Sequence, residues 1–308
     1  MLIPEEQCGV EARALRDPRA RHAGFLAFLA LSVVIFLPTI VMLWRQALTD
    51  ARYSHTIFIP LLSAAIICLE SRKIFAHCCY CLTAAGPLFL VLIGYAFLRS
   101  SLPLLHTPAS AYAPAIALMA VWITGFWLFY GTRALKAAGF PLVFLLWMVP
   151  LPPIVMDKAV HVLQSGSADV TYGLFRLTGV PVSRQGFTLS FPTVDIQIAA
   201  ECSGIRSTIA LFITGLLAGH LFLRTYWRQL CLALLIVPVV IFKNAVRIAT
   251  ITTLGMYVNP GFFHGRLHRY GGLPFSLLAL GILMPLLFVL HKSEQQKARL
   301  GQDVVGGR

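Results

Sequence analysis

Charged side chains are scarce in this sequence. Only 12% of its 308 residues are charged, whereas soluble domains carry about 25%. Acidic residues are the rarer kind, since 12 Asp and Glu stand against 25 Lys and Arg, a formal net charge of +13. With 58% hydrophobic residues and a mean hydropathy of +0.78, the composition excludes an ordinary soluble domain and predicts an integral protein of the lipid bilayer. The bases lie in short clusters rather than in one patch, so no nucleic-acid partner is expected.

The chain also lacks an internal repeat, a low-complexity linker and a cysteine pattern typical of a disulfide framework. Cys68 and Cys231 fall within apolar runs, where cysteine packs as a small hydrophobe. The run HCCYC, His77 to Cys81, contains residue types that bind zinc, but no second Cys/His pair follows nearby to complete four ligands. We therefore expect no metal and no cofactor, and the role of this run stays open.

Long apolar runs are the main feature that is present. A helix that crosses about 30 Å of hydrocarbon needs roughly 20 apolar residues, and eight runs approach that length. They lie at 24–44, 56–70, 84–99, 111–130, 138–156, 203–223, 229–257 and 272–291. The sequence thus predicts an all-α polytopic membrane protein with about eight transmembrane helices. One transmembrane domain over 23–291 is expected, between tails at 1–22 and 292–308.

Lys and Arg set the expected orientation of these helices, because cytoplasmic loops carry the excess of them. That excess falls on the side of both termini, which places both tails in the cytoplasm. The first apolar run follows more than twenty residues that include several arginines and acids, so it is expected to be an anchor rather than a cleaved signal peptide. The segment 157–202 is then the one sizeable insertion on the outer side of the membrane.

Two different periodicities divide that insertion. Its first part predicts a helix with one apolar side, formed by Val160, Leu163, Val170, Leu174 and Leu177. Its second part alternates apolar and polar residues around a Pro-Thr turn, which predicts a small β-hairpin before the sixth helix. The apolar members of that alternation are Phe187, Leu189, Phe191, Val194, Ile196 and Ile198.

Cys202 lies in the stretch AAECSGIRST, where the predicted hairpin meets the sixth helix. A helix N-terminus favours negative charge, so a thiolate at this point would be stabilised and ready for nucleophilic attack. A small buried cysteine beside a Ser203 N-cap is the alternative. Cys202 taken by itself favours the second interpretation.

The seventh predicted helix carries Lys243, Asn244 and Arg247 within an otherwise apolar run. A charge within a membrane helix costs at least about 2.5 kcal/mol unless it is paired or hydrated. Counting about 1.5 Å per residue from Gln229 places Arg247 near the outer surface, at the depth expected for Cys202. An arginine that snorkels to the interface is the alternative.

The loop before the last helix supplies a third polar group, His268. Imidazole has an unperturbed pKa near neutrality, so a histidine at the outer surface suits proton transfer. His264 lies four residues earlier, but the run HGRLH lacks the glutamate of a zinc-protease motif. A solvated loop histidine is the alternative. Together, Cys202, Arg247 and His268 match the nucleophile, oxyanion partner and base of acyl transfer through a thioester.

Four further residues are candidates for substrate binding. Arg206 lies one helical turn after Cys202 and suits a substrate carboxylate. His55 enters the second predicted helix from the same side, and Asn244 precedes Arg247 by three residues. Glu201 either orients a neighbouring base or lies solvated beside the helix N-terminus.

Five segments in this order resemble the exosortase/archaeosortase family of membrane-embedded cysteine transpeptidases. They are YSHTIFIP (53–60), VPLPPIVMD (149–157), AAECSGIRS (199–207), KNAVRI (243–248) and HRYGG (268–272). The resemblance covers about residues 25–291, and the ordered set is far more specific than any one motif.

The resemblance implies a catalytic triad of Cys202, Arg247 and His268. It implies partners that are membrane proteins with a C-terminal Pro-Glu-Pro motif, a transmembrane helix and a basic tail, the PEP-CTERM type of sorting signal. The enzyme is expected to cleave near that motif and to transfer the new C-terminus to an acceptor that the sequence does not identify, for cell-surface anchoring or export.

Two other functions remain open at this stage. An intramembrane cysteine protease would use the same thiol but would transfer the acyl group to water. A non-enzymatic transporter or polysaccharide-export subunit would use Lys243 and Arg247 to line a path for an anion. The lack of an internal two-fold repeat and the scarcity of acidic residues in the helices disfavour the transporter.

Overall fold

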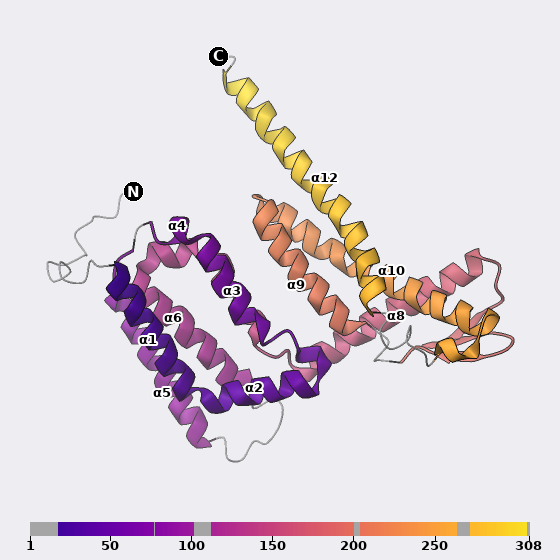
Figure 1. The fold of residues 1–308 in the computed structure, drawn as a ribbon, viewed down its shortest axis with the longest axis horizontal. Helices are drawn as coiled ribbons and strands as arrows, with labels where there is room; N and C mark the ends of the chain where they lie inside the picture. The colour runs from indigo at the N-terminus through magenta and orange to yellow at the C-terminus, as the bar shows by residue number, and fades with distance from the viewer. Residues whose placement is uncertain (1–17, 77, 102–111, 200–203, 264–271, 307–308) are drawn as a thin grey trace. The chain divides into compact units, whose positions relative to one another are not determined.

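The computed structural model describes residues 18–76, 78–101, 112–199, 204–263 and 272–306. The chain divides into two compact units, an N-terminal unit up to Pro153 and a C-terminal unit from Ile154. We describe each unit by itself. Most described residues are helical, and one small sheet lies in the C-terminal unit (Figure 1).

The N-terminal unit is helical in all its described elements. In order these are α1 (Pro18–Ile35), α2 (Leu37–Thr49), the 3₁₀ turn η3 (Ala51–Tyr53), α3 (Phe58–Leu69), α4 (Ser71–Ile74), η4 (Leu82–Ala84), α5 (Ala85–Ser101), α6 (Tyr112–Ala137), α7 (Gly139–Phe144) and η7 (Leu145–Met148). Helices α1 and α5 both pack against α6 (Figure 1). Helix α3 packs against α7.

The C-terminal unit combines helices with a three-stranded sheet. In order its elements are α8 (Pro153–Leu177), β1 (Ser183–Gln185), β2 (Thr188–Ser190), β3 (Asp195–Gln197), α9 (Ile205–Phe222), α10 (Tyr226–Tyr257), η9 (Pro260–Phe263) and α12 (Gly272–Gly306). Helices α9, α10 and α12 pack against one another. The turn from α9 to α10 is tied to α12 because the Arg224 backbone N–H donates to Glu294 Oε2 at 3.0 Å.

Among the described residues, five helices are long and apolar enough to cross a membrane: α1, α6, α9, α10 and the part of α12 from Pro274 to Lys297. The number is six if α7–η7 and α8 together count as one broken span. The second and third predicted spans correspond to α3 and α5, whose apolar helical parts are shorter. The structure thus shows several helices that could span a membrane, whereas the expected number of about eight spans stays a prediction.

Two expected spans are wrong as continuous helices. The run 24–44 is divided at Phe36, because Pro38 lies in the first turn of α2 and could not continue α1. Phe36 is fully buried and stacks on Tyr95 at a ring distance of 3.9 Å, which fixes the break. The run 138–156 ends at Met148, and the prolines of the following PLPP stretch account for that end.

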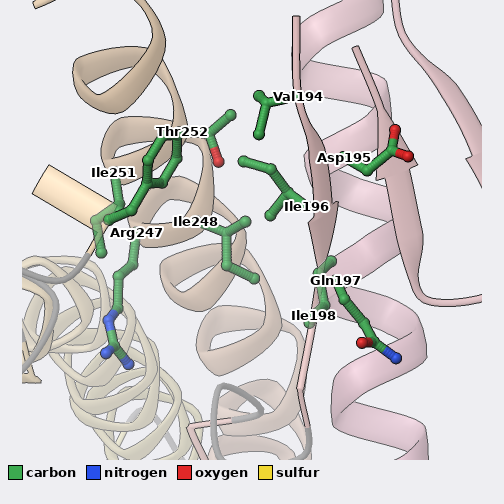
Figure 2. Close-up of a pocket in the computed structure, with 10 residues that line it drawn as sticks. Val194, Asp195, Ile196, Gln197, Ile198, Arg247, Ile248, Ile251 and Thr252 are labelled. Carbon is green, nitrogen blue, oxygen red and sulfur yellow. The ribbon is translucent and has the colours of Figure 1, made fainter. Parts of the chain in front are cut away.

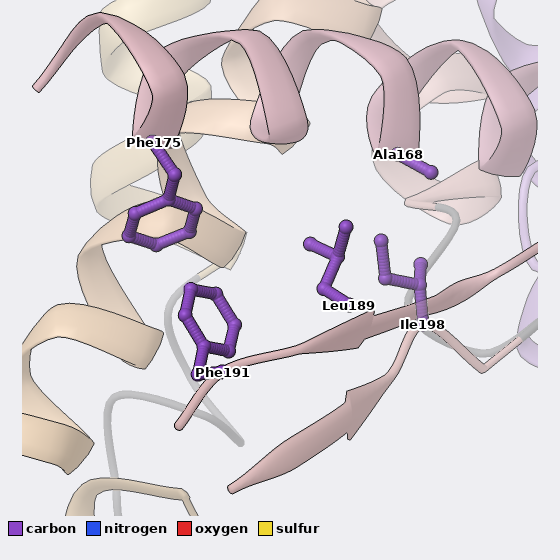
Figure 3. Packing of buried hydrophobic residues seen from close by; sticks show 5 residues of the cluster. All are labelled: Ala168, Phe175, Leu189, Phe191 and Ile198. Atoms are coloured by element: carbon purple, nitrogen blue, oxygen red, sulfur yellow. The ribbon is translucent and has the colours of Figure 1, made fainter. Parts of the chain in front are cut away.

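The predicted β-hairpin is confirmed. Strands β2 and β3 pair antiparallel with Leu189 opposite Ile196, and Phe191 N donates to Val194 O at 3.0 Å across the turn. The sequence did not predict β1, which pairs with the other side of β2. The buried cluster beneath the sheet consists of Ala168, Phe175, Leu189, Phe191 and Ile198 (Figure 3).

The predicted helix of the insertion is confirmed as α8, but its apolar side was only partly right. Val160 and Leu163 are buried as expected, whereas Leu177 is 86% exposed. The buried side of α8 includes polar residues instead, notably Gln164, Ser167 and Thr171. A pattern of apolar residues alone cannot reveal this side, because these polar groups are buried by virtue of their hydrogen bonds.

The described part of the HCCYC run lies along a kink in α6. Cys81 N donates to Leu128 O at 2.9 Å and Cys79 N to Tyr130 O at 3.4 Å. The kink is at Gly131, whose φ of 81° is in the left-handed region, and a Cβ there would lie 2.7 Å from Cys79 O. In the described parts of the chain, no three His, Cys, Asp or Glu side chains are grouped to hold a metal ion.

We predict that Gly131→Ala destabilises the chain by about 2 kcal/mol or more, because the alanine would add left-handed strain and a clash with a backbone oxygen. Gly94→Ala is the matched control, since a Cβ at Gly94 meets nothing within 4 Å. Thermal denaturation of both purified variants in detergent measures the effect. Equal midpoints for the two variants would show that the kink does not require glycine.

Candidate functional site

Helix α9 begins at a left-handed turn. Its N-cap is Gly204, with φ 72° and ψ 17°, which is the left-handed conformation that glycine adopts most easily. Gly204 is buried, and a Cβ at this position would lie 3.1 Å from Asn244 Oδ1 on α10. Glycine at 204 therefore permits both the turn and the close approach of α10. In the sequence this turn follows Cys202 by two residues.

Lys243 links α10 to the same turn. Its side chain is only 1% exposed although it lies near the middle of an apolar helix. Lys243 Nζ donates to Ser207 Oγ at 2.6 Å, and Ser207 Oγ donates to Gly204 O at 2.9 Å. A hydrogen bond to a charged group contributes about 1.5–3 kcal/mol, so this contact offsets part of the cost of burying the ammonium. The start of α9 is thus fixed to the middle of α10.

Asn244 and two residues of α8 extend these contacts. Asn244, which is fully buried, donates from Nδ2 to Ser167 Oγ at 3.0 Å. Gln164 Nε2 donates to the carbonyl oxygen of Ile198, at the end of the sheet. We call Gln164, Ser167, Gly204, Ser207, Lys243 and Asn244 the polar cluster. It joins α8, α9, α10 and the segment after β3.

Arg247 lies one helical turn beyond Lys243 on α10, and its side chain is half-buried. It lines a pocket of about 310 Å³ between α10 and β3 (Figure 2). The α10 wall consists of Arg247, Ile248, Ile251 and Thr252, and the opposite wall of the residues from Val194 to Ile198. An arginine at the end of a wall that is apolar apart from Thr252 is suited to hold an oxyanion or a carboxylate.

The structure describes four of the seven predicted site residues. Arg247 and Asn244 lie together on α10. Asn244 lies against Gly204, and Arg247 lines the pocket. Arg206 is exposed in the first turn of α9 and does not line the pocket. Cys202, Glu201 and His268 lie outside the described residues.

His55 belongs to the N-terminal unit, between η3 and α3. Burial lowers the pKa of His55, against hydrogen bonds with the backbone of Arg52 and Trp147, so the imidazole is neutral at pH 7. The neighbouring Tyr53 is buried and donates to Leu151 O at 3.3 Å. The segments YSHTIFIP and VPLPPIVMD therefore touch within this unit.

Sequence reasoning missed Ser207, Ser167 and Gln164. Each is a small or neutral polar residue in a helix, where the sequence alone does not distinguish a surface position from a buried hydrogen bond. One signal was available: Gln164, Ser167 and Thr171 recur at helical spacing on one side of α8. The buried charge of Lys243 required partners of this kind on neighbouring helices.

These long apolar helices and the buried polar cluster define a multi-pass membrane protein. A family model described as transmembrane exosortase (Exosortase_EpsH) matches residues 44–285. Because this match covers most of the chain, the protein belongs to the transmembrane exosortase family, as its motifs led us to expect. Membership indicates a membrane transpeptidase. Comparisons with curated proteins and with solved structures give no significant match.

We predict that Ser207→Ala lowers the free energy of unfolding by about 1–3 kcal/mol, because it removes a hydrogen-bond acceptor from the buried ammonium of Lys243. In a chain that already carries Lys243→Met, Ser207→Ala should lower the free energy of unfolding clearly less, because no ammonium then needs that acceptor. Thermal denaturation of the two single variants and the double variant in detergent measures this coupling.

The matched control is Thr214→Ala on the same helix. Thr214 Oγ1 donates only within α9, to Ala210 O at 2.9 Å, and its side chain is exposed. Its effect should add to that of Lys243→Met without coupling. If Ser207→Ala is also additive with Lys243→Met, the hydrogen bond does not stabilise the buried charge.

Proposed function

We propose that this protein is a bacterial exosortase that cleaves the C-terminal sorting signal of secreted proteins and transfers the new C-terminus to an acceptor. Its substrates would carry the PEP-CTERM type of signal. The site would lie on the periplasmic side of the inner membrane, with both termini in the cytoplasm. Family membership supports the reaction class.

The observation that carries the proposal is the hydrogen-bonded path from Lys243 through Ser207 to Gly204. It fixes the turn that follows Cys202 in sequence against α10, one helical turn from Arg247. A nucleophile and an oxyanion partner must be held in fixed relative positions, because small displacements of reacting groups cost large factors in rate. The polar cluster is suited to hold them.

In the first proposed step the Cys202 thiolate attacks the scissile carbonyl carbon of the substrate. The carbonyl oxygen takes up the negative charge, which the guanidinium of Arg247 stabilises. The C–N bond then breaks, the acyl group stays on Cys202 as a thioester, and the leaving amine takes a proton from His268.

In the second proposed step the acceptor nucleophile gives a proton to His268 and attacks the thioester. The new acyl bond forms and the C–S bond breaks, which regenerates the thiolate. Arg206, on the exposed side of the first turn of α9, is proposed to contact a substrate carboxylate, and Glu201 to orient His268 or Arg247. His55 and Asn244 are proposed to contact the substrate or to position the residues that do.

We predict that Cys202→Ala abolishes processing of a tagged substrate in cells, because no other group would form the acyl intermediate. Cys231→Ala is the matched control, since Cys231 is a free, half-buried cysteine of α10 and should be dispensable. Immunoblotting of the tagged substrate measures processing. Processing at the normal rate by the Cys202→Ala variant would refute the assignment of the nucleophile.

Mass spectrometry of the processed substrate in the same cells distinguishes transfer from hydrolysis. Transfer leaves an added moiety on the new C-terminus, which is the result we expect. A free carboxylate at every processed C-terminus would instead identify an intramembrane cysteine protease.

A further inference from the structure

Strand β3 forms one edge of the sheet, which has the order β1-β2-β3. Val194 and Ile198 form their backbone hydrogen bonds toward the β2 side, because Phe191 N donates to Val194 O and Ile198 N donates to Phe187 O. The backbone N–H and C=O groups of successive residues in a strand point alternately to its two sides. Those of Asp195 and Gln197, which alternate with Val194 and Ile198, therefore point away from β2. Within the described part of the chain, no other strand pairs with them.

This outer edge borders the pocket that Arg247 lines. The pocket is open to all five residues from Val194 to Ile198 along one wall and to α10 along the other. Figure 2 shows Gln197 toward the end where Arg247 lies and Asp195 toward the end where Thr252 lies. A strand edge beside an apolar wall has the features that bind an extended peptide: main-chain groups for pairing and a surface for alternate side chains.

We propose that the segment of the sorting signal around Pro-Glu-Pro binds in this pocket as a fourth strand, paired with β3. This inference rests on the proposed function and adds how the same site recognises its substrate. The main chain of the glutamate would pair with Gln197, and the substrate would continue past Arg247 toward the scissile bond.

The chemistry of Pro-Glu-Pro fits strand pairing. In a strand the main-chain groups of alternate residues face the same neighbour, so when the glutamate faces β3 both prolines face away from it. Proline is tolerated in a strand only where no N–H is needed, which is the outward-facing position here. Proline also favours an extended conformation in the residue before it, so the motif is already close to the bound shape.

Charge favours one register of this pairing. A glutamate opposite Asp195 would bring two carboxylates together, which is destabilising. Opposite Gln197, which is exposed like Asp195, the glutamate meets a neutral side chain on the same face of the sheet. The register with Gln197 is therefore the one we assign.

The first test replaces the outward-facing N–H at the edge. Gln197→Pro removes this donor without touching a bond to β2, whereas the control Gln197→Ala changes the side chain and keeps the N–H. We expect Gln197→Pro to slow processing of the tagged substrate at least about fivefold, the factor for one hydrogen bond of about 1 kcal/mol, and Gln197→Ala to have little effect. Normal processing by Gln197→Pro would overturn the strand pairing.

A second test remains decisive even if Gln197→Pro fails to fold. Gln197→Cys in the full-length Cys202→Ala chain is oxidised in membranes with full-length substrates that carry single cysteines along the motif segment. Directly opposed residues of paired strands have Cβ atoms about 4.5–5.5 Å apart, so cross-linking should peak at the glutamate position and fall at both neighbours. An even yield along the segment, or no cross-link, would contradict the proposal.

The proposed function and the proposed strand pairing can be refuted independently. If Cys202→Ala blocks processing but the edge variants and the cross-linking pattern show no pairing, the exosortase function stands and the strand-addition mode is wrong. If Cys202→Ala leaves processing intact, the proposed function fails whatever the edge variants show.

Discussion

A positive charge buried inside an apolar helix constrains the C-terminal unit of this protein. Lys243 is 1% exposed, at a depth where an uncompensated charge costs about 2.5–3.5 kcal/mol. The hydrogen bond to Ser207 makes that position tolerable, and Ser207 in turn bonds the carbonyl of Gly204. If helix α9 slid along α10, the ammonium would lose this acceptor. One contact thus sets the relation between α10, which carries Arg247, and the helix that begins three residues after Cys202 in the sequence.

The other elements of the unit extend that constraint to the sheet. Asn244 follows Lys243 and bonds Ser167 of α8, while Gln164 on the same side of α8 bonds the carbonyl of Ile198. The apolar cluster of Phe175, Leu189 and their neighbours holds the sheet over α8. The edge of β3 and the Arg247 wall of the pocket consequently belong to one packed assembly. Such rigidity is what a site needs to align an extended substrate.

Much of this arrangement was predictable from the sequence, and the failures have physical causes. Alternation of apolar residues revealed the β2–β3 hairpin, and the ordered motifs revealed the family. The breaks at Phe36 and after Met148 were missed because hydropathy measures how apolar a run is, whereas proline decides whether its backbone stays helical. The partners of Lys243 were missed because local periodicity does not reveal hydrogen bonds between residues that are far apart in the sequence. The catalytic roles of Cys202 and His268 remain predictions.

The central claim is acyl transfer through a thioester on Cys202. Purified full-length protein in nanodiscs can be mixed with a full-length substrate, quenched in acid before turnover is complete, and examined by peptide mass spectrometry. The account predicts a covalent adduct on Cys202, equal in mass to the substrate's N-terminal acyl fragment and released by hydroxylamine. Cleavage of the substrate with no adduct on Cys202, or with the adduct on another residue, would contradict it.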